Sequence, residues 1–71
     1  MKEPQTPREW LLFALHAYEI RIVADHGKLL EIEKDYVVEI EQNGVFKLLS
    51  GGAVVAPFVD LEELCQFIKM S

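Results

Sequence analysis

The chain has little cysteine, few basic residues and no long apolar run. Each of these shortages excludes a class of protein or of binding site. Its one cysteine, Cys65, has no second cysteine with which to form an internal disulfide. No apolar stretch approaches the roughly 20 residues that a membrane-spanning helix needs. His16, His26 and Cys65 lack the spacing of known metal ligands. We therefore expect no disulfide framework, no membrane partner and no metal or cofactor.

Acidic residues outnumber basic ones. Lys and Arg total 7 against 12 Asp and Glu, which gives a net charge of −5 at pH 7. The basic residues are scattered, whereas binding to a phosphate backbone requires them to cluster. The start of the chain, residues 1–9, is polar and shows no signal-peptide pattern. These features predict a cytoplasmic protein that does not bind nucleic acid.

The length limits the hydrophobic core. A chain of 71 residues forms one small domain, which buries only about 60% of its unfolded surface. Oligomerisation is a common way to stabilise such a domain. We expect a single domain over residues 1–71, with a disordered tail at 1–5, a helix at 6–17, an antiparallel sheet at 18–58 and a helix at 60–70.

Both predicted helices begin with capping signatures. Thr6 can cap the first helix, Pro7 suits its first position, and Glu9 completes a capping box. Asp60 and Glu63 repeat the arrangement at the second helix. An apolar stripe at helical spacing predicts the core-facing side of that second helix: Leu61, Leu64, Cys65 and Ile68.

The first helix is apolar on more than one side. Its buried side is predicted to carry two aromatic residues and two alanines: Trp10, Phe13, Ala14 and Ala17, with Leu11 and Tyr18 at the margin. Leu12 and Leu15 then fall on the opposite, polar side. Leucines there predict either a helix that is buried all round or a second face for a protein partner. A third alternative is two exposed side chains without a role.

Three glycine-ended loops predict three hairpins: Asp25-His26-Gly27, Gln42-Asn43-Gly44 and Ser50-Gly51-Gly52. Each suits a three-residue turn whose last residue is left-handed, a conformation that glycine adopts without a steric clash. As closing loops they pair Ala24 with Lys28, Ile40 with Phe46, and Leu48 with Val54. The turn at Lys34-Asp35 contains no glycine, and the sequence leaves its register open.

These registers place one uncharged face on the inside of a five-stranded meander. The expected fold is α+β, a two-layer sandwich of the order α-β-β-β-β-β-α with both helices on one face. Pro57 marks the last strand as an edge. The alternative is a small SH3-like barrel with flanking helices. The predicted inner face consists of Ile20, Ile22, Ala24, Leu30, Ile32, Val38, Ile40, Phe46, Leu48, Val54, Ala56 and Phe58.

The outer sheet face is the predicted functional surface. It carries an aliphatic set on the last three strands: Val37, Val45, Leu49, Ala53 and Val55. Glu39 and Glu41 belong to its charged rim. A contiguous exposed apolar patch with a polar rim indicates a protein–protein interface. The alternative is a solvated face whose β-branched residues serve strand propensity.

Catalytic signatures are weak. Asp25-His26 suits a hairpin tip, and Ser50 lacks the strand–turn–helix elbow of a nucleophilic serine. Glu39 and Glu41 lie on a solvated strand, where nothing would desolvate one acid of a catalytic pair. We therefore predict no catalytic residues, no enzyme activity and no small-molecule ligand.

Two functions fit these features. The first is a small accessory or adaptor module that binds itself or another protein through the outer face, with Leu12 and Leu15 as a further contact. The second is a small acidic inhibitor, of the anti-defence or nucleic-acid-mimic kind that phages encode. It would present glutamates to a basic partner: Glu31, Glu33, Glu39 and Glu41. A measurement of binding at different ionic strengths distinguishes the two functions, because electrostatic binding weakens as salt is added and apolar association does not.

Overall fold

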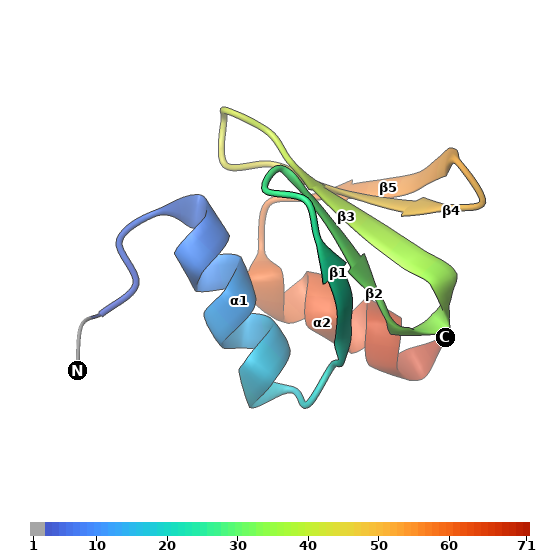
Figure 1. Cartoon of the computed structure of the whole chain (residues 1–71), viewed down its shortest axis with the longest axis horizontal. Coiled ribbons are helices and arrows are strands. Elements are labelled where there is room, and N and C mark those ends of the chain that lie inside the picture. The colour runs from blue at the N-terminus through green and yellow to red at the C-terminus, as the bar shows by residue number, and fades with distance from the viewer. Residues whose placement is uncertain (1–2) are drawn as a thin grey trace.

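The computed structural model describes residues 3–71. In chain order it contains α1 (Pro7–Ala17), β1 (Ile22–Asp25), β2 (Leu29–Ile32), the 3-10 turn η1 (Glu33–Asp35), β3 (Tyr36–Ile40), β4 (Phe46–Ser50), β5 (Ala53–Phe58) and α2 (Leu61–Met70). The strands form one open antiparallel sheet in the order β1-β2-β3-β4-β5. Both helices lie on the same side of it (Figure 1). The predicted sandwich is confirmed, and the barrel alternative is wrong.

One hydrophobic core joins the two layers. Buried side chains of both helices and of the sheet's inner face form a single cluster that contains no buried polar residue among residues 3–71. Its members are Leu11, Leu15, Ile20, Leu30, Ile32, Val38, Phe46, Leu48, Leu64, Cys65 and Ile68. Because both helices pack on this one face, the other face of the sheet is left without a covering layer.

Both helix starts have the predicted N-caps, but the return bond predicted from Glu63 at the second helix does not form. Thr6 Oγ1 accepts a hydrogen bond from Glu9 N at 3.1 Å, and Glu9 Oε1 accepts one from Thr6 N at 3.1 Å, which completes the capping box of α1. Asp60 Oδ1 caps α2 by accepting from Glu62 N at 2.8 Å. In the predicted tail at 1–5, Met1 and Lys2 lie outside the described residues, and residues 3–5 form neither helix nor strand.

The predicted buried side of α1 is wrong. Leu11 and Leu15 are fully buried, whereas Trp10 and Phe13 are 47% and 58% exposed. The core-facing stripe runs at i, i+3, i+4 and i+7 through Leu11, Ala14, Leu15 and Tyr18, about 120° around the helix from Trp10, Phe13 and Ala17. Leu12 is half-buried against the core. The leucine face predicted for a partner is therefore absent, since Leu15 is a core residue.

α1 ends in a Schellman motif without glycine. Ile20 N donates to Leu15 O at 2.8 Å, and Glu19 N donates to His16 O at 3.0 Å. Buried Ile20 and Leu15 supply the apolar contact that accompanies the motif. Glu19 occupies the left-handed position, with φ of 58°. A side chain costs about 1–2 kcal/mol there relative to the right-handed region.

Replacing Glu19 by glycine is expected to raise the free energy of unfolding by about 1 kcal/mol. Glycine removes the left-handed strain and also a negative charge from the negative end of the helix dipole. Urea denaturation followed by circular dichroism measures the change. Glu19→Ala is the matched control, because it removes the charge and keeps the strain. A glycine variant no more stable than the alanine variant would contradict the role of the left-handed backbone.

The β3–β4 hairpin has the predicted register. Ile40 pairs with Phe46, Val38 with Leu48, and Glu39 with Lys47. The loop between them ends at Gly44, whose φ is 74°. The inner and outer faces of these two central strands are therefore as expected, with Val38 and Leu48 buried in the core.

The β4–β5 register is different from the prediction. Gly51 and Gly52 both have positive φ and form a two-residue turn, so Ser50 pairs with Ala53 and Leu49 with Val54. A bulge follows, and Leu48 pairs with Ala56 instead of Val54. Two residues of β5 thus stand opposite one of β4. Val54 leaves the predicted inner face and is 55% exposed.

The β1–β2 register is also different. Ile22 pairs with Ile32 and, after an irregularity, Asp25 pairs with Leu30. The predicted pairing of Ala24 with Lys28 does not form, because the loop is longer and is closed by His26 N donating to Leu29 O at 2.8 Å. Within the loop, Gly27 N donates to Asp25 Oδ1 at 2.9 Å. Ile22, predicted to be on the inner face, is partly exposed.

The β2–β3 turn achieves its shape without glycine. Lys34 and Asp35 both have positive φ, of 65° and 62°. Lys34 Nζ donates to the carbonyl oxygens of Ile68 at 2.9 Å and Ser71 at 2.7 Å. These carbonyls at the end of α2 have no partner within the helix. The strained turn thereby ties the sheet to the last turn of α2.

Candidate functional site

A row of aliphatic side chains crosses the uncovered face of the sheet. Val37 pairs with Leu49 across β3 and β4, and Leu49 pairs with Val54 across β4 and β5. Val37 and Leu49 alternate with buried Val38 and Leu48, which fixes their direction away from the core. Val55, in the bulge next to this row, is 42% exposed. We call Val37, Leu49, Val54 and Val55 the outer patch.

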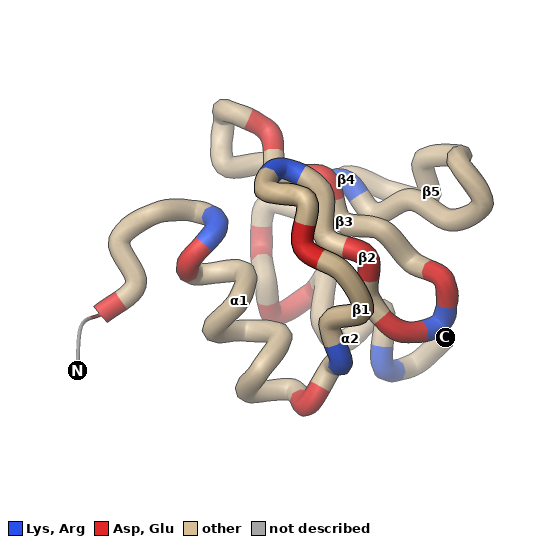
Figure 2. Tube along the Cα trace, viewed as in Figure 1, with Lys and Arg blue, Asp and Glu red and all other residues tan. Residues whose placement is uncertain are grey.

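The outer patch adjoins an uncharged edge strand. Residues 48–59, which include all of β5, contain no Asp, Glu, Lys or Arg (Figure 2). β5 pairs only with β4 and so forms one edge of the sheet. An exposed edge is normally protected by charges, proline or a bulge. β5 has Pro57 and the bulge but no charge, so apolar surface continues from the patch to the edge.

Charged residues form the rim on the side toward the β3–β4 loop. Lys47 Nζ lies 2.6 Å from Glu41 Oε1 and is paired across the strands with Glu39. The hydrogen bond and charge of Glu41 raise the pKa of Lys47. Val45, predicted to belong to the aliphatic set, lies at the far side of this ion pair. The structure therefore brings Val37, Leu49 and Val55 together, adds Val54, and separates Val45 from them.

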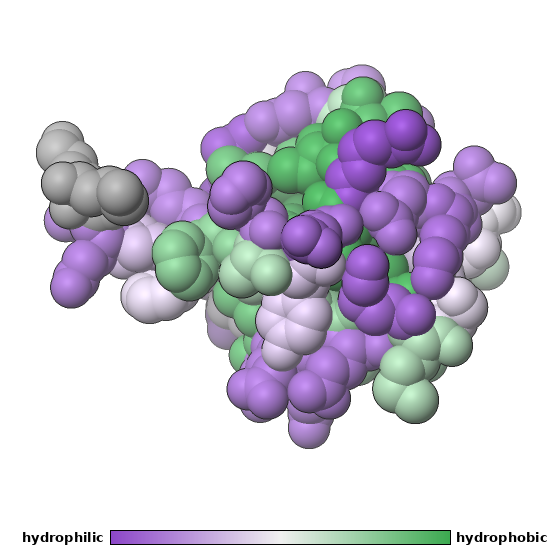
Figure 3. Space-filling view, turned by 90° about the horizontal axis from the view of Figure 1, so that it is seen from below, coloured by the Kyte–Doolittle hydropathy of each residue, from purple (hydrophilic) through white to green (hydrophobic). Residues whose placement is uncertain are grey.

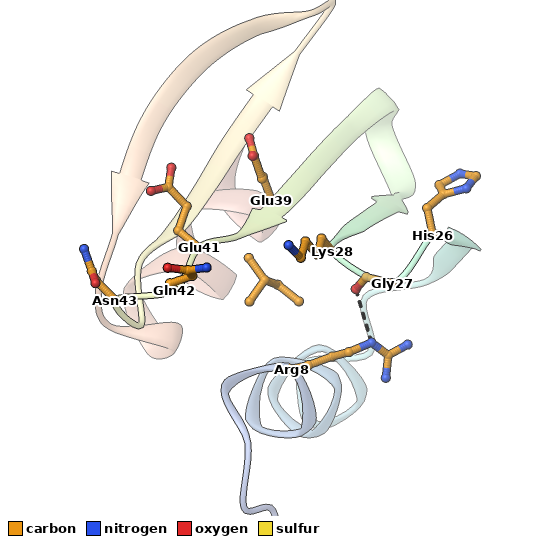
Figure 4. A pocket seen from close by; sticks show the side chains of 9 residues that line it. Arg8, His26, Gly27, Lys28, Glu39, Glu41, Gln42 and Asn43 are labelled. Carbon is orange, nitrogen blue, oxygen red and sulfur yellow. Dashed lines mark hydrogen bonds between the residues drawn. The ribbon is translucent and has the colours of Figure 1, made fainter.

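A groove lined mainly by polar and charged residues lies elsewhere. This groove of about 830 Å³ runs between the start of α1, the β1–β2 loop and the β3–β4 loop. Arg8 Nε donates to Gly27 O at 3.2 Å across its edge, and His26 points away from the other labelled side chains (Figure 4). Two of its lining residues pair with acids outside the lining: Arg8 binds Asp25, and His26 Nε2 lies 2.6 Å from Glu31 Oε2. These contacts tie the start of α1 to the β1–β2 loop and that loop to β2.

The ion pair between Arg8 and Asp25 changes the pKa of Asp25. The hydrogen bond from Arg8, followed by that from Gly27 N, lowers the pKa of Asp25. Because the folded-state pKa is depressed, the pair stabilises the fold above the ordinary pKa of Asp and loses its effect as the pH falls through the lowered value. Asp25 is thus engaged by Arg8 and Gly27 and does not orient His26.

The described residues contain neither a metal-binding group nor a membrane-spanning helix. Within residues 3–71, no three His, Cys, Asp or Glu side chains are grouped so that they could hold a metal ion. No helix in that part of the chain is long and apolar enough to cross a membrane. The one thiol, Cys65, is buried in α2, and burial raises its pKa to about 11.

The Cys65 thiol is expected to resist alkylation in the folded protein at neutral pH. The thiolate is the reactive species, and burial disfavours both its formation and contact with the reagent. Iodoacetamide labelling followed by mass spectrometry measures the rate, with protein unfolded in guanidinium chloride as the control. Labelling of the native protein as fast as the unfolded control would contradict the buried position of Cys65.

Sequence reasoning missed two surface features. Val54 is predicted on the inner face of the sheet. The Gly51-Gly52 pair, however, is a signal for a two-residue turn, which shifts the register between β4 and β5. Trp10 and Phe13 are predicted in the core, but they are exposed and contact each other edge to face, with ring centroids 6.1 Å apart.

Comparison of the chain with protein families, curated proteins and solved structures finds no match.

Proposed function

We propose that this protein is a small, non-enzymatic interaction module that self-associates through the outer patch. The observation that carries the proposal is the aliphatic row Val37–Leu49–Val54 on the sheet face that the helices leave uncovered. Burying such a row against an apolar partner is favourable by roughly 25 cal/mol per Å². The proposal includes a cytoplasmic location, which a single buried thiol supports because cytoplasmic cysteines stay reduced.

The size of the surface supports a weak association. Five strands spaced ~4.8 Å apart, each about five residues long at ~3.3 Å per residue, give a face of roughly 24 by 17 Å. Stable interfaces bury at least about 600 Å² on each partner, and this face, at roughly 400 Å², falls short of that area even when all of it is used. We therefore propose a homodimer that forms reversibly with concentration.

The rim supports a two-fold arrangement. In an isologous dimer the same patch meets itself, so the rim charges of one copy face those of the other. Lys47 pairs with Glu41 and stands opposite Glu39 in the same copy, so these three residues form a rim of both signs. An orientation that brings Lys47 of one copy near Glu39 of the other would add an attraction without breaking the pair to Glu41, which favours that orientation.

The acidic-inhibitor alternative has less support. Three of its four predicted glutamates already have partners. Glu31 lies beside His26, Glu33 Oε1 accepts from Arg21 N at 2.8 Å, and Glu41 pairs with Lys47. A partner would have to displace these contacts to use the carboxylates, which reduces the gain from binding.

Sedimentation equilibrium over a wide concentration range, at low and at high salt, tests the proposal. We expect the mean mass to rise from monomer toward dimer, with little change in the dissociation constant between the two salt concentrations. A monomer at every concentration would overturn self-association. A dimer that dissociates steeply with salt would instead favour an electrostatic contact.

A further inference from the structure

A second apolar surface lies at the N-terminal ends of the two helices. Here a hollow of about 460 Å³ separates the first turn of α1 from the first turn of α2. It is lined by Pro7, Trp10, Gly44, Phe46, Val59, Asp60 and Leu61. Phe46 is buried at its base, whereas Val59 is 76% exposed. Apolar side chains also reach the surface beside hydrophilic ones on the side of the molecule seen in Figure 3.

The hollow continues onto α1. Trp10 lines it and contacts Phe13, which lies one turn further along the helix and away from the core. Neither ring packs in the hydrophobic core, so core packing does not explain why two large aromatic residues occupy these positions. Exposed aromatic residues beside a hollow are typical of sites that receive an apolar side chain.

The charged residues around the hollow are mostly acidic. Asp60 lines the hollow, and the adjoining first turns of the two helices carry Glu9, Glu62 and Glu63; we call these four acids the acidic rim. Arg8 is the one basic residue in these turns, and it is paired with Asp25 and Gly27. The four carboxylates outweigh the partial positive charge of roughly +0.5 at each helix N-terminus, so an incoming Lys or Arg would meet net negative charge near the aromatic surface.

From this charge complementarity we propose that the hollow binds a short peptide segment of another protein, in which a bulky apolar side chain is flanked by Lys or Arg. The apolar side chain would lie between Trp10 and Val59, and the basic residues would lie over the acidic rim. A second copy of this chain fits poorly, because it would bring the same acidic rim against this one. The site is separate from the outer patch and does not depend on dimer formation.

Trp10 provides a direct readout, because it is the only tryptophan in the chain. We would select binders from a random peptide display library and add the best one, as a synthetic peptide, to the protein. The expected peptides combine an aromatic or aliphatic residue with neighbouring Lys or Arg. Their binding should shift Trp10 emission to shorter wavelength and weaken with added salt. Failure to enrich any sequence, or enrichment of acidic sequences, would overturn the proposal.

A matched pair of variants locates the binding. Val59→Arg places a positive charge in the hollow at a position outside the core, and we expect it to weaken peptide binding at least tenfold. Met70→Arg makes the same change in net charge at the other end of α2, where Met70 is almost fully exposed, and should leave the affinity unchanged. Equal affinities for the two variants would overturn the assignment of the site. A monomeric protein that still binds the peptide would contradict the proposed self-association and leave this inference standing.

Discussion

Replacing Leu15 by alanine is expected to lower the free energy of unfolding by about 3 kcal/mol. The side chain is fully buried in the core cluster, and a buried leucine truncated to alanine loses transfer free energy and leaves a cavity. Domains of this size have a total stability of roughly 4–10 kcal/mol. The variant should therefore unfold at much lower urea concentration than the parent protein.

Phe13→Ala is the matched control for Leu15→Ala. Phe13 is larger than Leu15 but more than half exposed, so its loss should cost less than about 1 kcal/mol. Urea denaturation curves of the two variants, recorded side by side, decide which side of α1 faces the core. A greater loss of stability for Phe13→Ala than for Leu15→Ala would contradict the packing described above.

Replacing Leu49 by glutamate is expected to weaken self-association at least tenfold while the fold is retained. Leu49 is the middle residue of the outer patch, with Val37 on one side and Val54 on the other. A carboxylate at this position would have to be desolvated in the dimer without a partner. Sedimentation equilibrium measures the dissociation constant, and circular dichroism checks the fold.

Two neighbouring substitutions serve as controls for Leu49→Glu. Ser50→Glu adds the same charge one residue further along β4, where the alternation of side chains directs it to the other face. It should leave the association unchanged. Leu48→Glu places the charge in the core and should unfold the protein. If Leu49→Glu unfolds the protein and Leu48→Glu does not, the inner and outer faces are reversed.

Local signals in the sequence predicted those elements whose geometry depends on a few neighbouring residues. The capping box of Thr6 and Glu9 fixes the start of α1, because the two hydrogen bonds involve residues only three positions apart. The Gln42-Asn43-Gly44 loop fixes the β3–β4 register in the same way, with Gly44 at the left-handed position.

The wrong predictions concern residues whose burial or backbone conformation depends on contacts with distant parts of the chain. Leu15 and Phe13 are both apolar, and only contact with the sheet and α2 determines which of them is buried. Glu19, Lys34 and Asp35 adopt left-handed backbone conformations that sequence patterns assign to glycine or asparagine. Lys34 is held there by carbonyls at the end of α2, more than thirty residues away in the sequence.

Only part of the outer patch could be predicted from the sequence, because some of its residues are positioned by local signals and others by long-range contacts. Val37 and Leu49 follow from the β3–β4 register, so their common outer face could be derived from sequence. Val54 joins them because Gly51-Gly52 forms a two-residue turn that pairs Val54 with Leu49. The bulge that follows, which sets Ala56 opposite Leu48, is a tertiary feature of the strand pair. Val45 is separated from Leu49 because Lys47 lies between them on the same face, as the alternation of side chains along β4 already implies.

The central claim is that copies of this protein meet through the outer patch, and backbone amide chemical shifts test it most directly. NMR spectra of uniformly 15N-labelled protein would be recorded from dilute to concentrated solution. We predict concentration-dependent shifts at Val37, Leu49, Val54 and Val55, with those of Trp10 and Phe13 unchanged. Spectra that do not change with concentration, or changes confined to the helices, would contradict the claim.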